Sequence, residues 1–277
     1  MSGALALARP VETVDRADHG ELARPAVPTG TANFLGIDFD CVPPDAMLRR
    51  IVERPADAPF AYVVTPNVDH VVRLNHAHPH LRQVYRRAWA TLCDSRILAK
   101  LAASDSIELP VTTGSDLTEA LCRHGIDRDA RIAVVGGDRG MIERLRTRYG
   151  FTDIAHFDPP MGFIDDPRAR ADAASFVASE RARYTFLAVG SPQQELLAHD
   201  VAARGDAVGV ALCVGASLEF LTGSKRRAPR LVQTLALEWL FRLVTDPARL
   251  WRRYVVEAPQ IFLIVRRWHR FVSRYCA

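Results

Sequence analysis

Three polar side chains stand directly after predicted strands, where they could hold or react with a ligand. Thr65 and Asn67 follow the buried-type strand Ala61–Val64, and Asp94 closes the apolar run Thr91–Cys93. The carboxyl ends of strands are where α/β folds place ligand contacts. A carboxylate held there can take the proton from a hydroxyl group as that hydroxyl attacks an electrophilic carbon. Helix N-capping is the alternative role for Asn67 and for Asp94.

A second polar cluster follows the predicted strand Tyr184–Val189. It reads Gly190-Ser191-Pro192-Gln193-Gln194-Glu195, and it opens a predicted helix. Pro192 suits the first turn of that helix, and Glu195 lies near its positive end. Side-chain amides and backbone N–H groups at such a turn can bind uncharged polar groups of a ligand. Ordinary helix capping is the alternative, although two glutamines and a glutamate are more than capping requires.

A glycine-rich turn, Gly136-Gly137, joins the predicted strand Arg131–Val135 to a helix. Backbone N–H groups at a helix start can bind a phosphate or the polar groups of a sugar. Asp158 follows about twenty residues later, after a second predicted strand Asp153–Phe157, as in dinucleotide-binding folds. The G-x-G-x-x-G spacing of those folds is absent, so a tight strand-to-helix turn also explains the glycines. A nucleotide-binding oxidoreductase or regulatory module built on this turn stays open as an alternative function.

Arginines interleave with aromatic residues near the C-terminus. Arg242, Arg249 and Arg252 are spaced by seven and three, which places them on one helix face if the chain tolerates a turn at Pro247. Guanidinium groups in such an array suit phosphate oxygens. A solvated basic face beside an apolar core is the alternative.

The charge of the chain is unevenly spread. From Lys225 onward 12 Lys and Arg stand against 3 Asp and Glu, a balance of +9, and the preceding residues, with 24 against 29, carry −5. This asymmetry predicts an anionic partner for the C-terminal region, namely a phosphate-bearing ligand, an anionic membrane or nucleic acid.

Predicted strands alternate with helices along most of the chain. The alternation favours a Rossmann-like α/β fold, with a mostly parallel sheet and helices on both faces. We expect residues 1–30 to be a disordered lead-in, residues 31–222 to form the Rossmann-like domain, and residues 223–277 to form a helical basic appendage. Residues 33–40 are expected to form one short strand and residues 68–88 one helix.

Cysteine usage and hydropathy indicate the cellular compartment in which the protein works. The five cysteines show neither a C-x-x-C pair nor the spacing of a disulfide framework, which favours a reducing cytoplasm. No signal peptide and no run of about 18 apolar residues is found, so we expect no membrane-spanning segment. Residues 260–275 combine apolar and basic side chains at helical spacing. Such a helix can lie at a bilayer interface or pack its apolar side on the domain, and both interpretations stay open.

Several of these motifs occur together in one known family. The segment from Gly223 to Arg252 reads G-x-x-x-R-A-P, then L-E-W-x-x-R-L, then P-x-R-x-x-R, and earlier the chain has T-x-N at residues 65–67 and G-x-P-x-Q-E at residues 190–195. In this order they resemble the WecG/TagA/CpsF family of bacterial glycosyltransferases, over roughly residues 33 to 256. Two departures stand out, because Ser95 replaces a family glycine after Asp94 and Val111 replaces a common arginine.

The resemblance implies an inverting, metal-independent glycosyltransferase of the hexosyl, N-acetylhexosaminyl or uronosyl class. It would move a sugar from a UDP-sugar to an acceptor linked to polyprenyl diphosphate, in cell-surface or exopolysaccharide biosynthesis. It would work without a cofactor, peripherally on the inner face of the cell membrane, and without nucleic acid as a partner. A monomer and a homo-oligomer are both compatible with the sequence.

Residue roles follow from the same resemblance and from the turns described above. Asp94 corresponds to the proposed general base, and Thr65 lies with it in the catalytic pocket. The predicted substrate-binding residues are Asn67, Gly136, Gly137, Gly190, Pro192, Gln194, Glu195, Arg227, Arg242, Arg249 and Arg252. The pair Asp38-x-Asp40 has the form that metal-dependent glycosyltransferases use, but two carboxylates this close are common by chance, so we expect no metal site.

Overall fold

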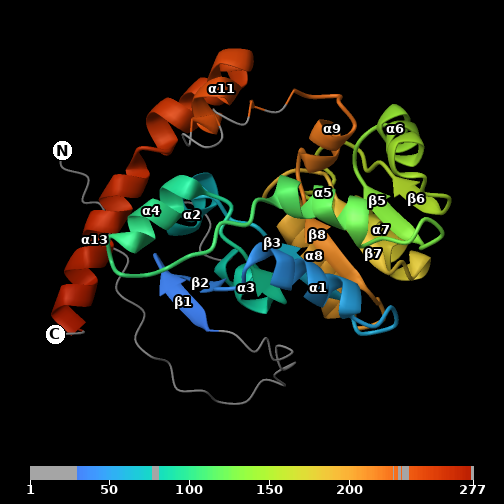
Figure 1. The fold of residues 1–277 in the computed structure, drawn as a ribbon, viewed down its shortest axis with the longest axis horizontal. Helices are drawn as coiled ribbons and strands as arrows, with labels where there is room; N and C mark the ends of the chain where they lie inside the picture. The colour runs from blue at the N-terminus through green and yellow to red at the C-terminus, as the bar shows by residue number, and fades with distance from the viewer. Residues whose placement is uncertain (1–29, 77–80, 227, 230–231, 233–236, 276–277) are drawn as a thin grey trace.

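A sheet of six parallel strands forms the centre of the computed structural model (Figure 1). Across the sheet the strands run in the order β4-β3-β8-β7-β5-β6. Their bounds are β3 (Ala61–Val64), β4 (Ala90–Thr91), β5 (Ile132–Val135), β6 (Ile154–Phe157), β7 (Tyr184–Leu187) and β8 (Val210–Cys213). The structure describes residues 30–76, 81–226, 228–229, 232 and 237–275, so the expected lead-in lies outside the described residues except for its last position. The predicted parallel α/β fold is confirmed.

Helices cover both faces of this sheet (Figure 1). Helices α2, α3, α7 and α8 pack on one face, and α1, α5, α6 and α9 pack on the other. The helices of the domain are α1 (Pro44–Glu53), α2 (Val68–His76), α3 (Leu81–Arg87), α4 (Arg96–Ala103), α5 (Gly114–His124), α6 (Arg139–Tyr149), α7 (Pro167–Glu180), α8 (Gln193–Arg204) and α9 (Ser217–Leu221). The single helix expected over residues 68–88 is therefore two helices, and residues 77–80 between them lie outside the described residues.

Successive side chains of each strand point to opposite faces of the sheet, so the apolar core has two parts. In β3, Tyr62 and Val64 belong to the core under α2 and α8, whereas Ala61 and Val63 belong to the core under α1 and α5. All four positions are buried, as expected for a parallel strand covered on both faces. The neighbouring strands β3 and β8 lead into α2 and α9, which lie on opposite faces. A crevice for a ligand is expected where adjacent strands diverge in this way, at their carboxyl ends.

A small antiparallel hairpin precedes the sheet. Strands β1 (Thr31–Phe34) and β2 (Ile37–Asp40) pair with each other through a two-residue turn. The expectation of one strand over residues 33–40 is wrong, because Leu35 and Gly36 adopt φ angles of 55° and 80° and reverse the chain. The Asp40 carboxylate accepts the N–H of Thr91 at 2.7 Å, which ties the hairpin to β4.

Helices at the C-terminus run along one side of the domain (Figure 1). They are α11 (Glu238–Thr245), α12 (Pro247–Trp251), the π-helical turn η1 (Arg252–Glu257) and α13 (Gln260–Tyr275). Ile261, Ile264 and Val265 of α13 are buried in the core that also holds α2, and the ring of Trp268 lies edge-on to Phe34, with 6.3 Å between the ring centroids. The same helix leaves other apolar side chains exposed. In the part of the chain that the structure describes, no helix has both the length and the apolar character to cross a membrane.

Candidate active site

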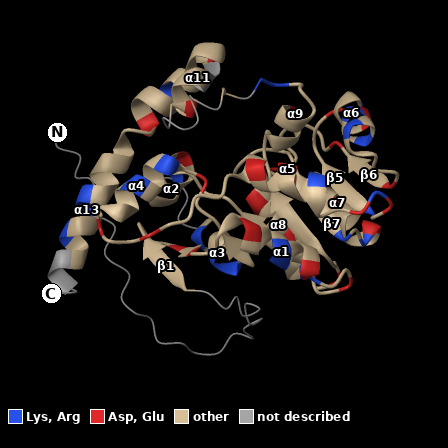
Figure 2. Ribbon diagram, in the orientation of Figure 1, with Lys and Arg blue, Asp and Glu red and all other residues tan. Residues whose placement is uncertain are grey.

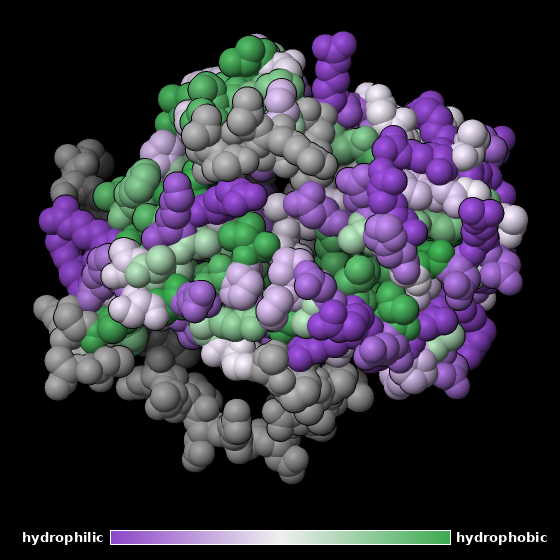
Figure 3. Space-filling view, viewed as in Figure 1, coloured by the Kyte–Doolittle hydropathy of each residue, from purple (hydrophilic) through white to green (hydrophobic). Residues whose placement is uncertain are grey.

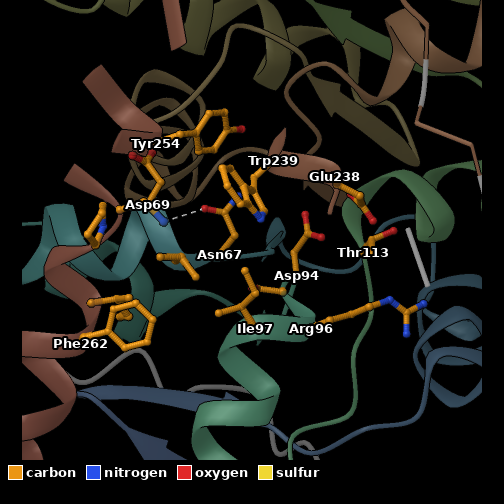
Figure 4. Close-up of a pocket in the computed structure, with 15 residues that line it drawn as sticks. Asn67, Asp69, Asp94, Arg96, Ile97, Thr113, Glu238, Trp239, Tyr254 and Phe262 are labelled. Carbon is orange, nitrogen blue, oxygen red and sulfur yellow. Dashed lines mark hydrogen bonds between the residues drawn. The ribbon is translucent and has the colours of Figure 1, made fainter. Parts of the chain in front are cut away.

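A cavity of about 380 Å³ lies between the carboxyl ends of β3 and β4 and the C-terminal helices (Figure 4). The domain contributes the polar part of its wall, and α11, η1 and α13 contribute the largely apolar part. The lining residues are Asn67, Val68, Asp69, Asp94, Ser95, Arg96, Ile97, Thr113, Glu238, Trp239, Tyr254, Ala258, Pro259, Ile261 and Phe262. Of the predicted site residues, Asn67 and Asp94 line this cavity.

Gly114, the first residue of α5, lies next to the predicted catalytic residues. A Cβ atom on Gly114 would lie 2.9 Å from Thr65 Oγ1 and 3.8 Å from both Asp94 Oδ2 and Ser217 Oγ. Ser217 follows β8, and its hydroxyl also lies 3.2 Å from that of Ser115. Three strand ends therefore converge on one glycine, whose lack of a side chain leaves room for them.

Asp94 lines the cavity, and another residue caps the helix that follows it. The N-cap of α4 is Ser95, whose hydroxyl accepts the N–H of Leu98 at 3.1 Å. The alternative role of Asp94 as this cap is therefore wrong. The departure from the family pattern at Ser95 thus has a local structural role, since a hydroxyl satisfies a helix N–H that a glycine could not.

Asn67 does cap a helix, and it also lines the cavity. Its Oδ1 accepts the N–H of Asp69 at 3.0 Å (Figure 4). Its own N–H donates to Nδ1 of His70 at 3.1 Å, and the carboxylate of Asp69 accepts from Arg73 at 2.5 Å. The predicted capping role is confirmed, and the first turn of α2 presents a hydrogen-bonded polar surface to the cavity.

Gln194 and Glu195 lie behind this surface rather than on it. Both are buried, and the amide of Gln194 donates to Glu195 at 2.9 Å while its oxygen accepts the N–H of Gly215 at 2.8 Å. Glu195 Oε1 lies 3.7 Å from Nε2 of His70. Burial raises the pKa of the Glu195 carboxyl, against the hydrogen bond from Gln194, which lowers it. These two side chains join the start of α8 to the end of β8 and to the base of α2, next to the cavity.

The glycine turn after β5 is separated from β3 by two strands. Gly136 and Gly137 have φ angles of 92° and 77°, and a Cβ on Gly136 would lie 2.8 Å from Val189. Nε2 of His156 lies 3.3 and 3.1 Å from their two carbonyl oxygens. The glycines are thus required by a tight turn packed against β6 and β7. Gly190 and Pro192, at the end of β7, are also absent from the cavity lining given above.

The predicted arginine array is only partly described. Arg227 and the side chains of Arg242 and Arg249 lie outside the described residues. Arg252 is exposed, and its Nε lies 3.3 Å from the carboxylate of Glu257. A continuous helix does not connect these positions, since α11 ends at Thr245 and α12 begins at Pro247.

The D-x-D pair belongs to the hairpin. Asp38 accepts a hydrogen bond from Asn33 at 2.6 Å, and Asp40 is bonded to β4 as described above. Within the described residues, no group of three or more His, Cys, Asp or Glu side chains is placed to hold a metal ion.

Sequence reasoning missed part of the cavity wall. No individual role follows from the sequence motifs for Thr113, Glu238, Trp239 or Tyr254, which also line the cavity. The L-E-W motif at residues 237–239 carried the available signal, because Glu238 and Trp239 both line the cavity.

One comparison with known proteins bears on this site. The model of the family described as "Glycosyl transferase WecG/TagA/CpsF family" matches residues 32–275. The match therefore includes both walls of the cavity.

Proposed function

We propose, from the premise that the chain belongs to the WecG/TagA/CpsF family of glycosyltransferases, that it moves a sugar with inversion from a UDP-sugar to an acceptor linked to polyprenyl diphosphate. The observation that carries the proposal is the placement of Asp94. Its carboxylate faces a cavity beside Thr65, with the apolar C-terminal helices opposite. The product would enter cell-surface or exopolysaccharide biosynthesis.

Asp94 acts in this proposal as the general base. It takes the proton from an acceptor hydroxyl while the hydroxyl oxygen forms a bond to the anomeric carbon of the donor sugar. The bond from that carbon to the diphosphate oxygen breaks in the same step, and UDP leaves with the electron pair. Attack from the face opposite the leaving group inverts the anomeric configuration. Thr65 and Asn67 lie beside Asp94, and in this proposal they orient the reacting sugars.

Positive charge is needed to stabilise the departing diphosphate. The sequence of the C-terminal region provides it as arginine side chains. Arg227, Arg242, Arg249 and Arg252 are the predicted contacts, in a region whose balance is +9. Fixed cations stabilise charge that develops on a leaving group. We therefore propose that the reaction needs neither metal nor cofactor. Gly136, Gly137, Gly190, Pro192, Gln194 and Glu195 lie outside the cavity lining, and their contact with the substrate stays a prediction.

The C-terminal helices are also the proposed contact with the inner face of the cell membrane. Exposed apolar side chains gather over α11 (Figure 3), and α13 carries Arg266, Arg267 and Arg270 towards its C-terminal end (Figure 2). Apolar and basic side chains together favour an anionic bilayer interface. An acceptor whose lipid stays in the bilayer would then reach Asp94 through this side of the protein.

Substitution of the base tests the proposal. Asp94→Asn should lower turnover by about 10²–10⁴-fold and leave UDP-sugar binding intact. Transfer to a polyprenyl-diphosphate-linked saccharide would be measured for a panel of nucleotide sugars, with and without EDTA. Asp158→Asn is the matched control, because Asp158 is an exposed carboxylate that follows β6 outside the cavity. Near-normal turnover in Asp94→Asn would remove the base from the mechanism, and activity lost to EDTA and restored by Mg²⁺ would refute metal independence.

A further inference from the structure

The two walls of the cavity differ in chemistry. Asn67, Asp94 and Thr113 present polar atoms from the domain, and Trp239 and Tyr254 present aromatic rings from the C-terminal helices (Figure 4). The two ring centroids lie 6.2 Å apart, with 55° between the ring planes. Trp239 is 36% exposed, so its ring is not packed into a core. Two aromatic rings therefore face hydrogen-bonding groups across an open cavity.

The charged side chains that line the cavity disfavour an anionic ligand. Asp69, Asp94 and Glu238 contribute carboxylates, whereas Arg96 is the basic side chain among the described lining residues. Arg73 offsets the charge of Asp69 from behind the wall. A diphosphate placed here would meet like charge. An uncharged ring with hydroxyl groups has no such penalty.

A sugar ring matches both walls at once. Its equatorial hydroxyls can bond to carboxylate, amide and hydroxyl oxygens, and the C–H bonds of its face can lie on the electron-rich face of an aromatic ring. The cavity volume of about 380 Å³ falls within the range of roughly 300–1,000 Å³ that is usual for small-molecule sites.

We infer that Trp239, with Tyr254, forms the platform for the acceptor's sugar ring and selects uncharged rings over uronic acids. The inference rests on the proposed function, because it uses the role of Asp94. The hydroxyl that Asp94 deprotonates must lie within hydrogen-bond reach of that carboxylate, so the ring carrying it occupies this cavity. Beyond the platform, the apolar wall continues through Pro259, which precedes α13, and through Ile261 and Phe262 of α13, next to exposed Leu263.

Removal of the platform tests the inference. Trp239→Leu should raise the KM for a soluble acceptor analogue, a hexose joined through diphosphate to a short alkyl chain, by roughly 10-fold. The KM for the UDP-sugar should stay within about 2-fold, since the donor is not placed on this ring, and Trp239→Phe should retain most of the acceptor affinity. Trp251→Leu is the matched control, because Trp251 lies in the same segment, is 53% exposed and does not line the cavity. Thermal unfolding of each variant confirms that it folds.

The same assay measures the preference for neutral acceptor sugars over uronic acids. The wild-type protein should use a neutral hexose analogue in preference to the corresponding uronic acid, and Glu238→Gln should narrow that difference. A rise in donor KM with an unchanged acceptor KM in Trp239→Leu would assign the platform to the donor sugar and overturn the inference, while turnover by the wild-type protein would leave the proposed function standing. Failure of the wild-type protein to transfer any sugar to any analogue would instead refute the proposed function itself.

Discussion

The α/β part of the chain, from β1 to α9, and the C-terminal helices at residues 237–275 differ in how many apolar side chains they leave exposed. In the domain, the strands are buried between two cores, and the helices place their apolar faces against the sheet. Among the described residues, eleven large apolar side chains are exposed, and ten of them lie between Leu237 and Phe271, the other being Met161. The domain is stabilised by its own interior, whereas the C-terminal helices bury one side and leave another uncovered.

This difference indicates where binding surfaces lie. An apolar side chain that stays exposed in a folded protein contributes nothing to its stability, and a concentration of them marks a surface for another molecule. The C-terminal helices expose apolar side chains both to the cavity, through Trp239 and Phe262, and to the outside, through Val255 and Leu263. We therefore expect the domain to hold the catalytic groups and the helices to hold the lipid-linked substrate and the membrane.

The largest expected effect is the difference in stability between substitutions on the buried and the exposed side of α13. Ile264→Ala should lower the free energy of unfolding by about 2–5 kcal/mol, because Ile264 is buried against the domain. Leu263→Ala should change it by less than about 0.5 kcal/mol, because Leu263 is exposed. Urea unfolding of both variants measures the difference. Equal, small losses would mean that α13 is not docked on the domain.

A second prediction concerns Gly114, which lies next to Thr65 and Asp94. Gly114→Ala should lower turnover by about 10- to 100-fold, because its Cβ would lie 2.9 Å from Thr65 Oγ1 and would displace that hydroxyl. The same overpacking should lower the free energy of unfolding by about 1–3 kcal/mol, so rates are compared well below the unfolding temperature of the variant. Gly140→Ala is the control in the first turn of α6, where a Cβ would meet only the ends of the flexible Arg144 and exposed Asp138 side chains. Unchanged initial rates in Gly114→Ala would contradict the crowded site described above.

A third prediction concerns the outer side of α13. Leu263→Glu should weaken binding to anionic vesicles by about 10-fold, since it removes an inserted side chain and adds a negative charge. Met161→Glu makes the same chemical change on an exposed residue of the domain and should leave binding unaltered. Sedimentation with vesicles at low salt measures both. Equal weakening in the two variants would indicate a general charge effect rather than a membrane face.

The smallest expected effect concerns the buried carboxyl of Glu195. Because burial raises its pKa, the protonated form is favoured in the folded protein, and the stability that this group contributes is lost as the pH rises above its ordinary value of 4.5. Glu195→Gln keeps an oxygen for Gln194, so we expect a change of about 1 kcal/mol in the free energy of unfolding. Relative to the wild type, the variant should become more stable as the pH rises from 4 to 8. A relative stability that falls over this range would show that the fold stabilises the carboxylate.

The positions of Thr65, Asn67 and Asp94 could be predicted from sequence because parallel strands end at one edge of a sheet. Their identity as strand-end residues therefore implies proximity. In the structure Asn67 and Asp94 line one cavity, and Thr65 and Asp94 lie around Gly114. The turn at Leu35 and Gly36 was missed, because a leucine with positive φ has no sequence signal of its own.

Polar side chains were harder to place. Gln194 satisfies a backbone N–H of Gly215, and a local pattern cannot distinguish such a role from contact with a ligand. The positions of Trp239 and Tyr254 depend on how α13 docks against α2 and the hairpin, through contacts such as that of Trp268 with Phe34. These contacts join residues far apart in the chain, so the sequence spacing within the C-terminal segment does not predict them.

The most direct measurement is a crystal structure of the protein with UDP and a soluble acceptor analogue. Our account predicts that the sugar ring of the analogue lies between the domain and the C-terminal helices, with one hydroxyl about 2.6–3.2 Å from the Asp94 carboxylate. An analogue whose sugar lies at the Gly136-Gly137 turn, or elsewhere with no hydroxyl near Asp94, would contradict it.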